Sequence, residues 1–599
     1  MNTVETENLT SMSIDKQIQL VDPFPALEER PCYRVYENPF MRGTRKYREG
    51  VYHHYLTKAK EGESQNPVDD YLCGVLKIIA DTKDAGGQNF GKLLAFKPKD
   101  RSGEKRLNVP MDMVLNDQSG DLIRVLGNEG LYIDFNNRRR INAYINTQHP
   151  NRYMEAAHAT GWHGNDFVLP DEVIGSGDVW FQSRERIAAY SSAGTLEGWQ
   201  QSISDQAIGN PLLQLAICGA LAGPLLKRIG NKGGGLHFYG ASSKGKSTAL
   251  EAAASVWGKG DTFYQTWNAT ANALEGSARL HTDTMLGLDE IHNCKPRDLD
   301  NAVYALLNGA GRGRANERGD ARNIARWRVF CISNGEYSIP DALAREHIKH
   351  MPGQGVRLLD IFATGGQYGF FNDIHDTSSP ALFAQHIKAA SNQHYGHAGK
   401  AFVRYLVALS QDEEPDYSDM VNEITNALTT DETGDQERRA AQLFALCALA
   451  GELAIEAKIL TWETGQATQA AKHGFKVWLE QRGTHGRNAE DIAVFKGILN
   501  FIDAHGGARF ELVEGEDRTV INRAGWKRID GDKTIYMFTS GGLEEAAGRG
   551  VKQVTKALAS IGAFLVNDSG SYSKNTRTKD GVTRLYHLDT EAIKKVSDE

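Results

Sequence analysis

LHFYGASSKGKSTALEAAASVWG, residues 236–258, sets the expected architecture of this chain. It opens with a short apolar run, passes through the pattern G-x-x-x-x-G-K-S, and continues into an Ala- and Leu-rich segment that predicts a helix. Two glycines allow the backbone N–H groups to point at phosphate oxygens, at a helix N-terminus that favours an anion. The segment therefore predicts a phosphate-binding loop for a nucleoside triphosphate.

The residue types of this loop indicate ATP and Mg²⁺ as ligands. We expect Lys246 to reach the β- and γ-phosphates and the Ser247 hydroxyl to bind Mg²⁺. The predicted nucleotide-binding residues are Gly240, Ala241, Ser242, Ser243, Lys244, Gly245, Lys246, Ser247 and Thr248. A glycine-rich turn with a chance lysine is the alternative reading.

Two later segments carry polar residues at the ends of predicted strands. Met285 to Leu288 is apolar and leads into Asp289 and Glu290, and residues 328–333 lead into Asn334. We expect Asp289 to hold the Mg²⁺, Glu290 to polarise the attacking water, and Asn334 to contact the γ-phosphate or that water. Polar groups at the carboxyl ends of buried parallel strands indicate an α/β ATPase core of the additional-strand (ASCE), AAA-like type.

Composition limits the class of protein. The 599 residues suffice for roughly three or four domains. No run approaches the roughly 20 apolar residues of a membrane span, and the start lacks the features of a signal peptide, so we expect a cytoplasmic protein. Six cysteines form no CxxC pair, which argues against a zinc site or a disulfide framework. The formal net charge of −8 means that a nucleic-acid role must depend on local basic patches.

The pattern of apolar residues predicts a multidomain α/β chain. Short alternating runs separated by turn residues indicate a mostly β N-terminal accessory domain, and spacing at i, i+3 and i+4 indicates helices beyond residue 365. The expected parts are a disordered tail (1–29), the accessory domain (30–200), the ATPase domain (201–365), a helical lid or collar (366–485) and a C-terminal winged helix (486–599).

Two basic segments are candidates for DNA contacts. Residues 311–328 hold six arginines against two acids, among them Arg312, Arg314 and Arg318. In the C-terminal part, the pairing of ARFELVE with KTIYMFT, two helices and a strand-loop-strand with Lys574, Arg577 and Lys579 follow the order of a winged helix. The alternatives are a subunit-interface loop or solvated hairpin for the first segment, and a protein–protein module for the second.

Several segments together resemble the DUF927 family, the predicted ATPase domain of Cch-like helicases carried by bacterial mobile elements. They are TWNATANALEGSARLHTDTMLGLDEIHN (266–293), GRGRANERGDARNIARWRVFCISNGE (311–336), GQGVRLLDI (353–361), RPCYRVYE (30–37) and TGWHGNDFVLP (160–170). The resemblance implies an AAA+ ATPase related to MCM-like replicative helicases, forming a ring, expected to be a hexamer, that moves on DNA. It also matches the phosphate-binding loop, Asp289, Glu290 and Asn334 to the family's nucleotide site.

Arg357 matches an arginine of the family's G-x-x-V-R-L segment, although its spacing from Gly353 or Gly355 is only approximate. In a ring ATPase, such a guanidinium stabilises charge on the γ-phosphate from the same or the neighbouring subunit. The sequence leaves open which of the two applies.

Two classes of function fit these patterns. The first is a motor, a DNA-stimulated ATPase that translocates on or unwinds DNA during replication of a plasmid, prophage or genomic island. The second is an oligomerisation switch of the STAND or defence type, in which the nucleotide controls assembly without unwinding. The basic segments favour the motor.

Overall fold

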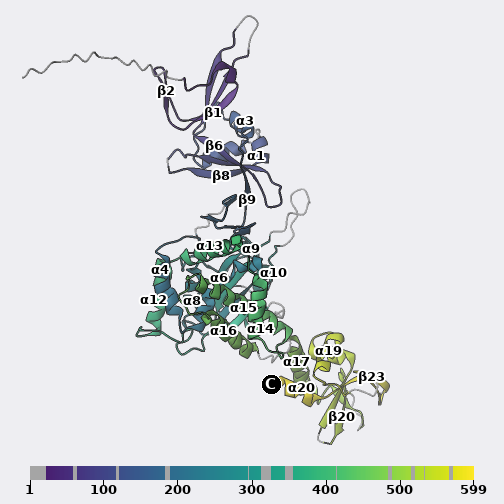
Figure 1. Ribbon diagram of the computed structural model, residues 1–599. Helices are drawn as coiled ribbons and strands as arrows, with labels where there is room; N and C mark the ends of the chain where they lie inside the picture. The colour runs from purple at the N-terminus through teal and green to yellow at the C-terminus, as the bar shows by residue number, and fades with distance from the viewer. Residues whose placement is uncertain are drawn as a thin grey trace, which may run out of the picture. The chain divides into compact units, whose positions relative to one another are not determined.

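A computed structural model describes residues 22–598 except for 59–63, 101, 117–119, 182–188, 295, 312–325, 345–354, 413, 483–488, 515–519, 532 and 566–570. The chain divides into two compact units, shown with their elements in Figure 1. Unit 1 comprises Met1–Ala157 and Asp178–Gln182, and unit 2 comprises His158–Gly177 and Ser183–Glu599. None of the helices in the described part of the chain has the length and apolarity needed to span a bilayer.

Unit 1 is built mainly from β-strands, as its alternating sequence predicts. One sheet has the order β1-β4-β5, a second has the order β13-β9-β6-β7-β8, and β2 and β3 form a separate ribbon. The strands are β1 (Cys32–Tyr36), β2 (Phe40–Arg42), β3 (Arg45–Tyr47), β4 (Gly50–Leu56), β5 (Pro67–Cys73), β6 (Leu76–Lys83), β7 (Gly91–Phe96), β8 (Lys105–Pro110), β9 (Tyr153–Ala157) and β13 (Val179–Phe181). Helices α1 (Met111–Leu115), α2 (Asp121–Asn128) and α3 (Arg140–Thr147) contribute to its main core.

The tail expected to be disordered over residues 1–29 needs a correction at its end. Residues 1–21 lie outside the described residues, but Phe24 is 5% exposed and the 3₁₀ turn η1 (Leu27–Glu29) follows it. The Phe24 ring packs against Tyr36, Phe40, Tyr47 and Tyr52. Burial of this aromatic ring explains why residues 22–29 are ordered although their polar composition resembles a tail.

The central sheet of unit 2 is parallel throughout and has the order β15-β16-β17-β14-β18. Its strands are β15 (Gln265–Thr266), β16 (Thr284–Asp289), β17 (Val329–Gly335), β14 (Gly233–Tyr239) and β18 (Leu358–Phe362). Strands β14 and β17 are buried over almost their whole length, which explains their continuous apolar runs. Because all five strands run the same way, their carboxyl ends meet at one edge of the sheet.

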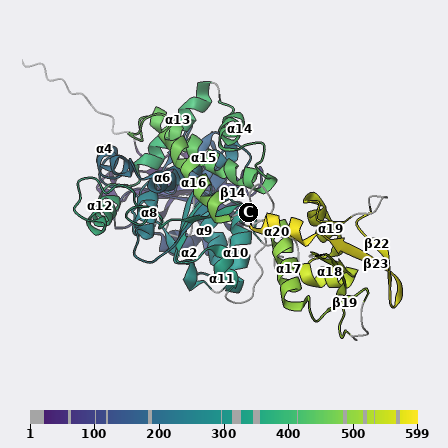
Figure 2. The ribbon, with the colours of Figure 1, turned by 90° about the horizontal axis from the view of Figure 1, so that it is seen from below.

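Helices from distant parts of the sequence cover this sheet and share one core. Helices α6 (Pro211–Ala222), α15 (Asp435–Glu456) and α16 (Gln466–Arg482) lie side by side, as Figure 2 shows. Their side chains form a single cluster with β14, β17 and α8 (Lys246–Ala254). The boundary expected at residue 365 therefore does not separate two cores.

The remaining helices of unit 2 surround this core. They are α4 (Leu196–Trp199), the π-helical η2 (Gln200–Ser204), α5 (Asp205–Ala207), α7 (Leu225–Arg228), α9 (Ala271–Leu280), the 3₁₀ turn η3 (Ile291–Asn293), α10 (Pro296–Asn308), α11 (Ile339–Ala344), α12 (Pro380–Gln393), α13 (His397–Asp412) and α14 (Tyr417–Leu428). A small sheet of β10 (Gly161–His163), β11 (Asp166–Val168) and β12 (Val173–Ile174) also packs here. Trp162 donates from its indole nitrogen to the Pro224 carbonyl at 2.8 Å, so this hairpin belongs with unit 2 rather than with the accessory domain expected over 30–200.

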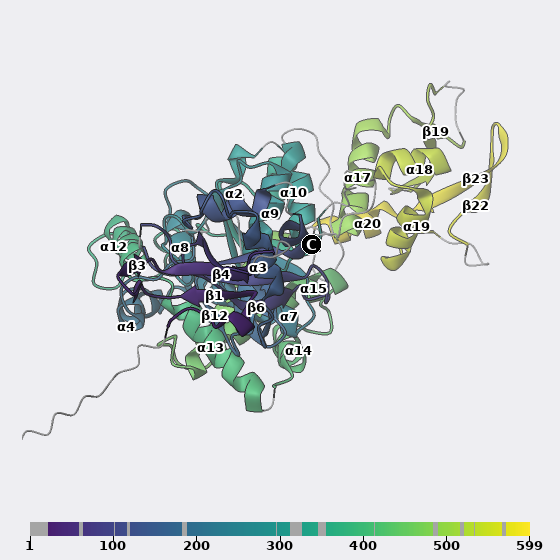
Figure 3. The same ribbon diagram turned by 90° about the horizontal axis from the view of Figure 1, so that it is seen from above.

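The C-terminal part of the chain has its own apolar core and the sheet order β19-β20-β21-β23-β22. Its elements are α17 (Ala489–His505), β19 (Phe510–Leu512), β20 (Gly525–Asp530), β21 (Lys533–Phe538), α18 (Ser540–Ala547), α19 (Val551–Ser560), β22 (Lys574–Thr578), β23 (Gly581–Leu588) and α20 (Thr590–Asp598). The expected pairing of ARFELVE with KTIYMFT is wrong, because β21 pairs with β20 and β23 instead, and β19 pairs with β20. Strands β22 and β23 form the hairpin visible in Figure 3.

Candidate functional site

The loop between β14 and α8 has the backbone that its two glycines were expected to provide. Gly240 has φ +141° and Gly245 has φ +101°, a region that side chains with a Cβ rarely adopt. A Cβ at Gly240 would lie 2.5 Å from Thr364 Oγ1, and one at Gly245 would lie 2.7 Å from the Phe371 ring. The loop is therefore curled and tightly packed, and Ala241 to Lys244 between the glycines are exposed.

Lys246 begins α8 and folds back over the loop. It is 8% exposed, and its ammonium donates to the carbonyl oxygens of Gly240 at 2.9 Å and Ala241 at 2.6 Å. Burial lowers the pKa of Lys246, whereas the carboxylates of Glu336 and Asp289 act in the opposite direction. A buried ammonium whose hydrogen bonds to described residues go to neutral carbonyls would gain from an anionic partner beside it.

Asp289 and Glu290 lie where β16 ends, at the same edge of the sheet as the loop. Burial, and then the neighbouring Glu290, raises the pKa of Asp289. Within the described residues, Asp289 Oδ1 is a buried oxygen with no hydrogen-bond partner. An unpartnered buried carboxylate oxygen is a group that a divalent cation would satisfy, and oxygen is the ligand that Mg²⁺ prefers.

Glu290 has an exposed side chain and an unusual backbone. Its φ is +57°, a region that costs free energy for a residue other than glycine and that occurs often at functional sites. This conformation ends the strand abruptly, since η3 starts at the next residue.

Asn334 connects the other groups. The Glu290 backbone N–H donates to Asn334 Oδ1 at 3.2 Å, and Asn334 Nδ2 donates to Ser247 Oγ at 3.3 Å. Asn334 is 2% exposed and lies on β17, between the strand of the loop and the strand of the acids. The strand order therefore brings Ser247, the acidic pair and Asn334 into one hydrogen-bonded group.

Several residues that no sequence motif predicted support the phosphate-binding loop and the neighbouring strands. The Phe370 N–H donates to the Lys244 carbonyl at 2.8 Å, and segment 364–371 packs against both glycines of the loop. This segment therefore stabilises the loop conformation. Within the sheet, Trp267 Nε1 donates to Ser333 Oγ on β17 at 2.8 Å, and His237 Nδ1 on β14 lies 3.0 Å from the same oxygen. Burial lowers the pKa of His237 to about 4, so this histidine is neutral near pH 7.

Arg357 is not brought to this site. It precedes β18, its carbonyl accepts from Gly235 N–H at 2.8 Å, and its guanidinium donates to Asn308 Oδ1 at 2.5 Å. Since β18 is parallel to β14, Arg357 lies at the edge where the strands begin, and the loop lies where they end. The five residues of β18 alone span roughly 16 Å at about 3.3 Å each.

The expected DNA contacts are only partly described. Arg312, Arg314 and Arg318 lie outside the described residues. Lys574 and Arg577 lie on β22, with Arg577 exposed, and Lys579 lies in the turn to β23. Lys579 Nζ is 4.0 Å from the Glu511 carboxylate.

Comparison with family models matches residues 44–326 to DUF927, a domain of unknown function. This stretch of the chain therefore resembles that domain. The matched range includes the phosphate-binding loop, Asp289 and Glu290, and ends before Asn334 and Arg357. Comparison with curated proteins finds no significant match.

Comparison with solved structures finds a similar fold. The fold is similar to that of a structure described as SCCmec type IV Cch, an active helicase, with a TM-score of 0.67 and 19% identity over 92% of this chain and 98% of the other. At this identity the similarity shows a shared fold. A structure described as the apo A form of the NrS-1 C-terminal region also matches, with 8% identity over 86% of this chain and 96% of the other, but its TM-score of 0.29 supports no argument.

Proposed function

We propose that the chain is an ATP-dependent DNA helicase or translocase with an ASCE, AAA+ type ATPase core. The observation that carries the proposal is the group formed by Ser247, Asp289, Glu290 and Asn334 beside a curled phosphate-binding loop. Phosphoryl transfer requires phosphate positioning, a metal and an oriented water, and these residue types supply all three.

Each residue then has a definite task. Lys246 and the backbone N–H groups of 241–247 bind the phosphates, and Ser247 and Asp289 would hold Mg²⁺. Mg²⁺ in that place supplies charge neutralisation on the phosphate oxygens. Glu290 orients the attacking water. Asn334 fixes the positions of the Glu290 backbone and the Ser247 hydroxyl relative to each other through its two hydrogen bonds.

Two observations, the fold and the distribution of charge, support the proposal that the free energy of ATP hydrolysis drives movement on DNA. The fold is shared with a structure described as an active helicase, and residues 44–326 match the DUF927 family model. The arrangement of α18, α19 and the β22–β23 hairpin supports a winged helix with Lys574, Arg577 and Lys579 on its wing. We further propose a ring, expected to be a hexamer, that acts in the replication of a mobile genetic element, with Arg357 serving the site of a neighbouring subunit.

The test compares ATP hydrolysis by the purified chain with and without single-stranded or forked DNA, at a stated salt concentration, together with strand displacement on the fork. Stimulation by DNA and displacement of the strand support the motor. Hydrolysis that ignores DNA, without displacement, supports an oligomerisation switch instead. Because phosphate contacts weaken with salt, the stimulation should fall steeply as salt rises.

A further inference from the structure

The β2–β3 ribbon of unit 1 presents a concentration of positive charge. Its strands pair Phe40 with Tyr47, Met41 with Lys46, and Arg42 with Arg45, and Gly43 at φ +61° makes the turn possible. The segment PFMRGTRKYR, residues 39–48, contains four cations and no acid. In a chain with a formal net charge of −8, such a local cluster of cations favours binding of an anionic partner.

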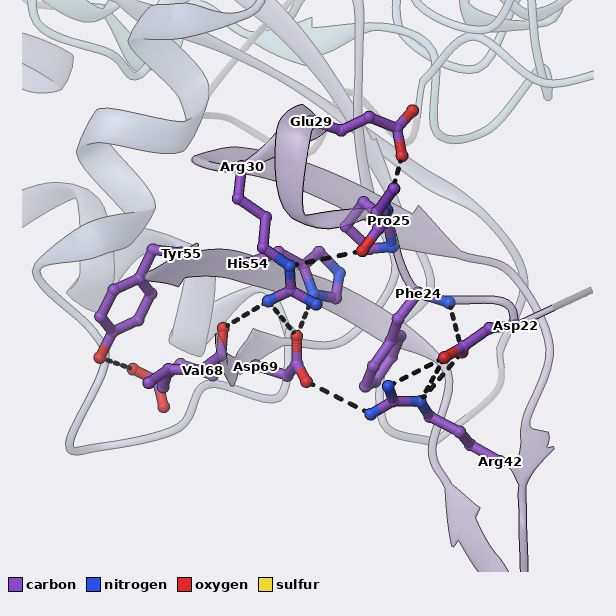
Figure 4. A network of polar contacts seen from close by, with 12 residues as sticks. Asp22, Phe24, Pro25, Glu29, Arg30, Arg42, His54, Tyr55, Val68 and Asp69 are labelled. Atoms are coloured by element: carbon purple, nitrogen blue, oxygen red, sulfur yellow. Dashed lines mark hydrogen bonds and ion pairs between the residues drawn. The ribbon is translucent and has the colours of Figure 1, made fainter. Parts of the chain in front are cut away.

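The base of the ribbon is fixed by aromatic packing and by the ion pairs of Arg42 with Asp22 and Asp69. The Phe24 ring lies 5.6 Å from Phe40 and 5.0 Å from Tyr47, and those two rings stack on each other at 5.4 Å. Arg42 donates to Asp22 at 2.9 Å, and its guanidinium lies 4.6 Å from the Phe24 ring centroid. Figure 4 draws these three side chains. The charge of Arg42 is thereby neutralised, and its contacts attach the ribbon to the segment that contains Asp22 and Phe24.

Asp69 strengthens the same base from the neighbouring strand. Its Oδ1 lies 2.7 Å from Arg30 Nη1 and 2.7 Å from His54 Nδ1, in the network drawn in Figure 4. His54 is fully buried, and burial lowers its pKa even though Asp69 acts in the opposite direction. The ribbon therefore projects from a rigid, well-packed foundation.

The outer part of the ribbon is free to bind. Arg45 and Lys46 are exposed, and the ion pairs formed among the described residues include neither of them. The Arg45 guanidinium lies 5.2 Å from the Tyr47 ring centroid, within the range of a cation–π contact. Met41, the partner of Lys46 across the ribbon, is 55% exposed.

Arg48 extends this surface beyond the ribbon. Its guanidinium lies 5.2 Å from the Tyr71 ring centroid and 5.4 Å from that of Tyr132. Tyr132 is 39% exposed. An arginine beside a partly exposed tyrosine is a combination that binds a phosphate and stacks on a base at the same time.

We propose that the β2–β3 ribbon is a DNA-contacting element in which Arg45 and Lys46 neutralise backbone phosphates. Arg48 and Tyr132 extend this contact surface beyond the ribbon. A two-stranded ribbon has the dimensions to lie along a nucleic-acid groove or backbone. The element is separate from the basic segment 311–328 and from the C-terminal hairpin. Its DNA role is independent of ATP hydrolysis, so it gives unit 1 a function of its own.

The test measures DNA binding by the full-length chain without nucleotide. Fluorescence anisotropy with labelled single strands and duplexes of about 30 nucleotides follows the dissociation constant across a salt series. The double variant R45A/K46A should bind DNA about three- to thirty-fold more weakly, and its slope of log K against log salt should fall by roughly 1.5 because two phosphate contacts are lost. The single-strand and duplex arms show which form the ribbon prefers.

The matched control is K105A/R106A on β8 of the same unit. These two neighbouring cations are also exposed but pair with Glu129 and Glu104, both at 3.3 Å, so this variant should keep the wild-type slope. The charge-preserving R45K variant should also keep it, which separates loss of charge from loss of folding.

A wild-type slope and affinity in R45A/K46A would overturn the proposal, and so would the absence of DNA binding by the wild-type chain. A ribbon that binds an acidic protein instead would give the same result, because the DNA affinity would not change. Ribbon-dependent binding in a chain that fails to hydrolyse ATP would refute the proposed ATPase function alone.

Discussion

At the scale of single residues, the Asn334 side chain connects the Glu290 backbone to the Ser247 hydroxyl. Replacing it with alanine removes the acceptor for Glu290 N–H and the donor to Ser247 Oγ. We expect N334A to lower kcat about tenfold or more, with a smaller effect on KM, since about 1.4 kcal/mol of lost positioning is a tenfold change in rate. Steady-state kinetics with ATP and Mg²⁺ measure this effect.

Asn426 offers the control for that variant. It is exposed on α14 and accepts a hydrogen bond from Arg438, away from the sheet edge that carries the phosphate-binding loop. N426A should leave kcat unchanged. Equal kinetics for N334A and the wild-type chain would remove Asn334 from the site.

A second residue-scale prediction concerns Asp360 on β18. Burial raises the pKa of Asp360 to about 7, although the Ile339 N–H donates to its carboxylate at 2.9 Å. The unfolded chain loses this proton near its ordinary pKa of about 3.9, so between pH 4 and pH 7, both approximate, the unfolded state binds fewer protons than the folded one. The stability contributed by the protonated Asp360 is therefore lost as the pH rises through about 7.

D360N keeps the shape and the acceptor oxygen but cannot ionise. The thermal midpoint of unit 2 should fall less between mildly acidic and mildly alkaline pH in D360N than in the wild-type chain, as differential scanning calorimetry would show. The same pH dependence in both proteins would mean that Asp360 ionises as readily in the folded chain as in water.

At the scale of elements, β18 separates Arg357 from the phosphate-binding loop of its own chain. A catalytic Arg357 must therefore act on another subunit. R357A should hydrolyse ATP about 10³-fold more slowly while still binding it. Mixing R357A with E290Q subunits should restore activity, because each supplies what the other lacks. No recovery across a range of mixing ratios would contradict the assignment in trans.

The β22–β23 hairpin is the second element that makes a prediction. On β22, Lys574 is partly exposed and Arg577 is exposed, and both side chains are cations. K574A/R577A should weaken DNA binding several-fold and reduce the salt slope by up to roughly 1.5, measured by anisotropy. K594A, which removes a lysine paired with Glu591 at 3.1 Å, is the control. Unchanged DNA binding in K574A/R577A would favour a protein–protein role for this module.

At the scale of the whole molecule, the local patterns predict the central sheet well. A G-x-x-x-x-G-K-S loop, a strand ending in two acids and a strand ending in Asn334 all require parallel strands with a common edge, and the observed sheet has that arrangement. These features depend on short stretches whose chemistry and periodicity are visible in the sequence.

The features that the sequence did not predict depend on contacts between distant residues. Phe24 joins an aromatic cluster only because β2 and β3 fold beside it, and Trp162 packs on Pro224 rather than on its sequence neighbours. Helices α15 and α16 complete the core of the sheet although they follow it by many residues. Periodicity identifies such elements but does not say which partner they pack on.

We propose that one site, with Lys246, Asp289, Glu290 and Asn334 at the edge of a parallel sheet, hydrolyses ATP. The most direct measurement determines ATP affinity and turnover, with Mg²⁺ present, for the wild-type chain, K246A and E290Q. The claim predicts turnover in the wild-type chain, about tenfold or more weaker binding in K246A, and retained binding with turnover reduced by about 10² or more in E290Q. Turnover in E290Q equal to that of the wild-type chain, or no hydrolysis by the wild-type chain, would contradict it.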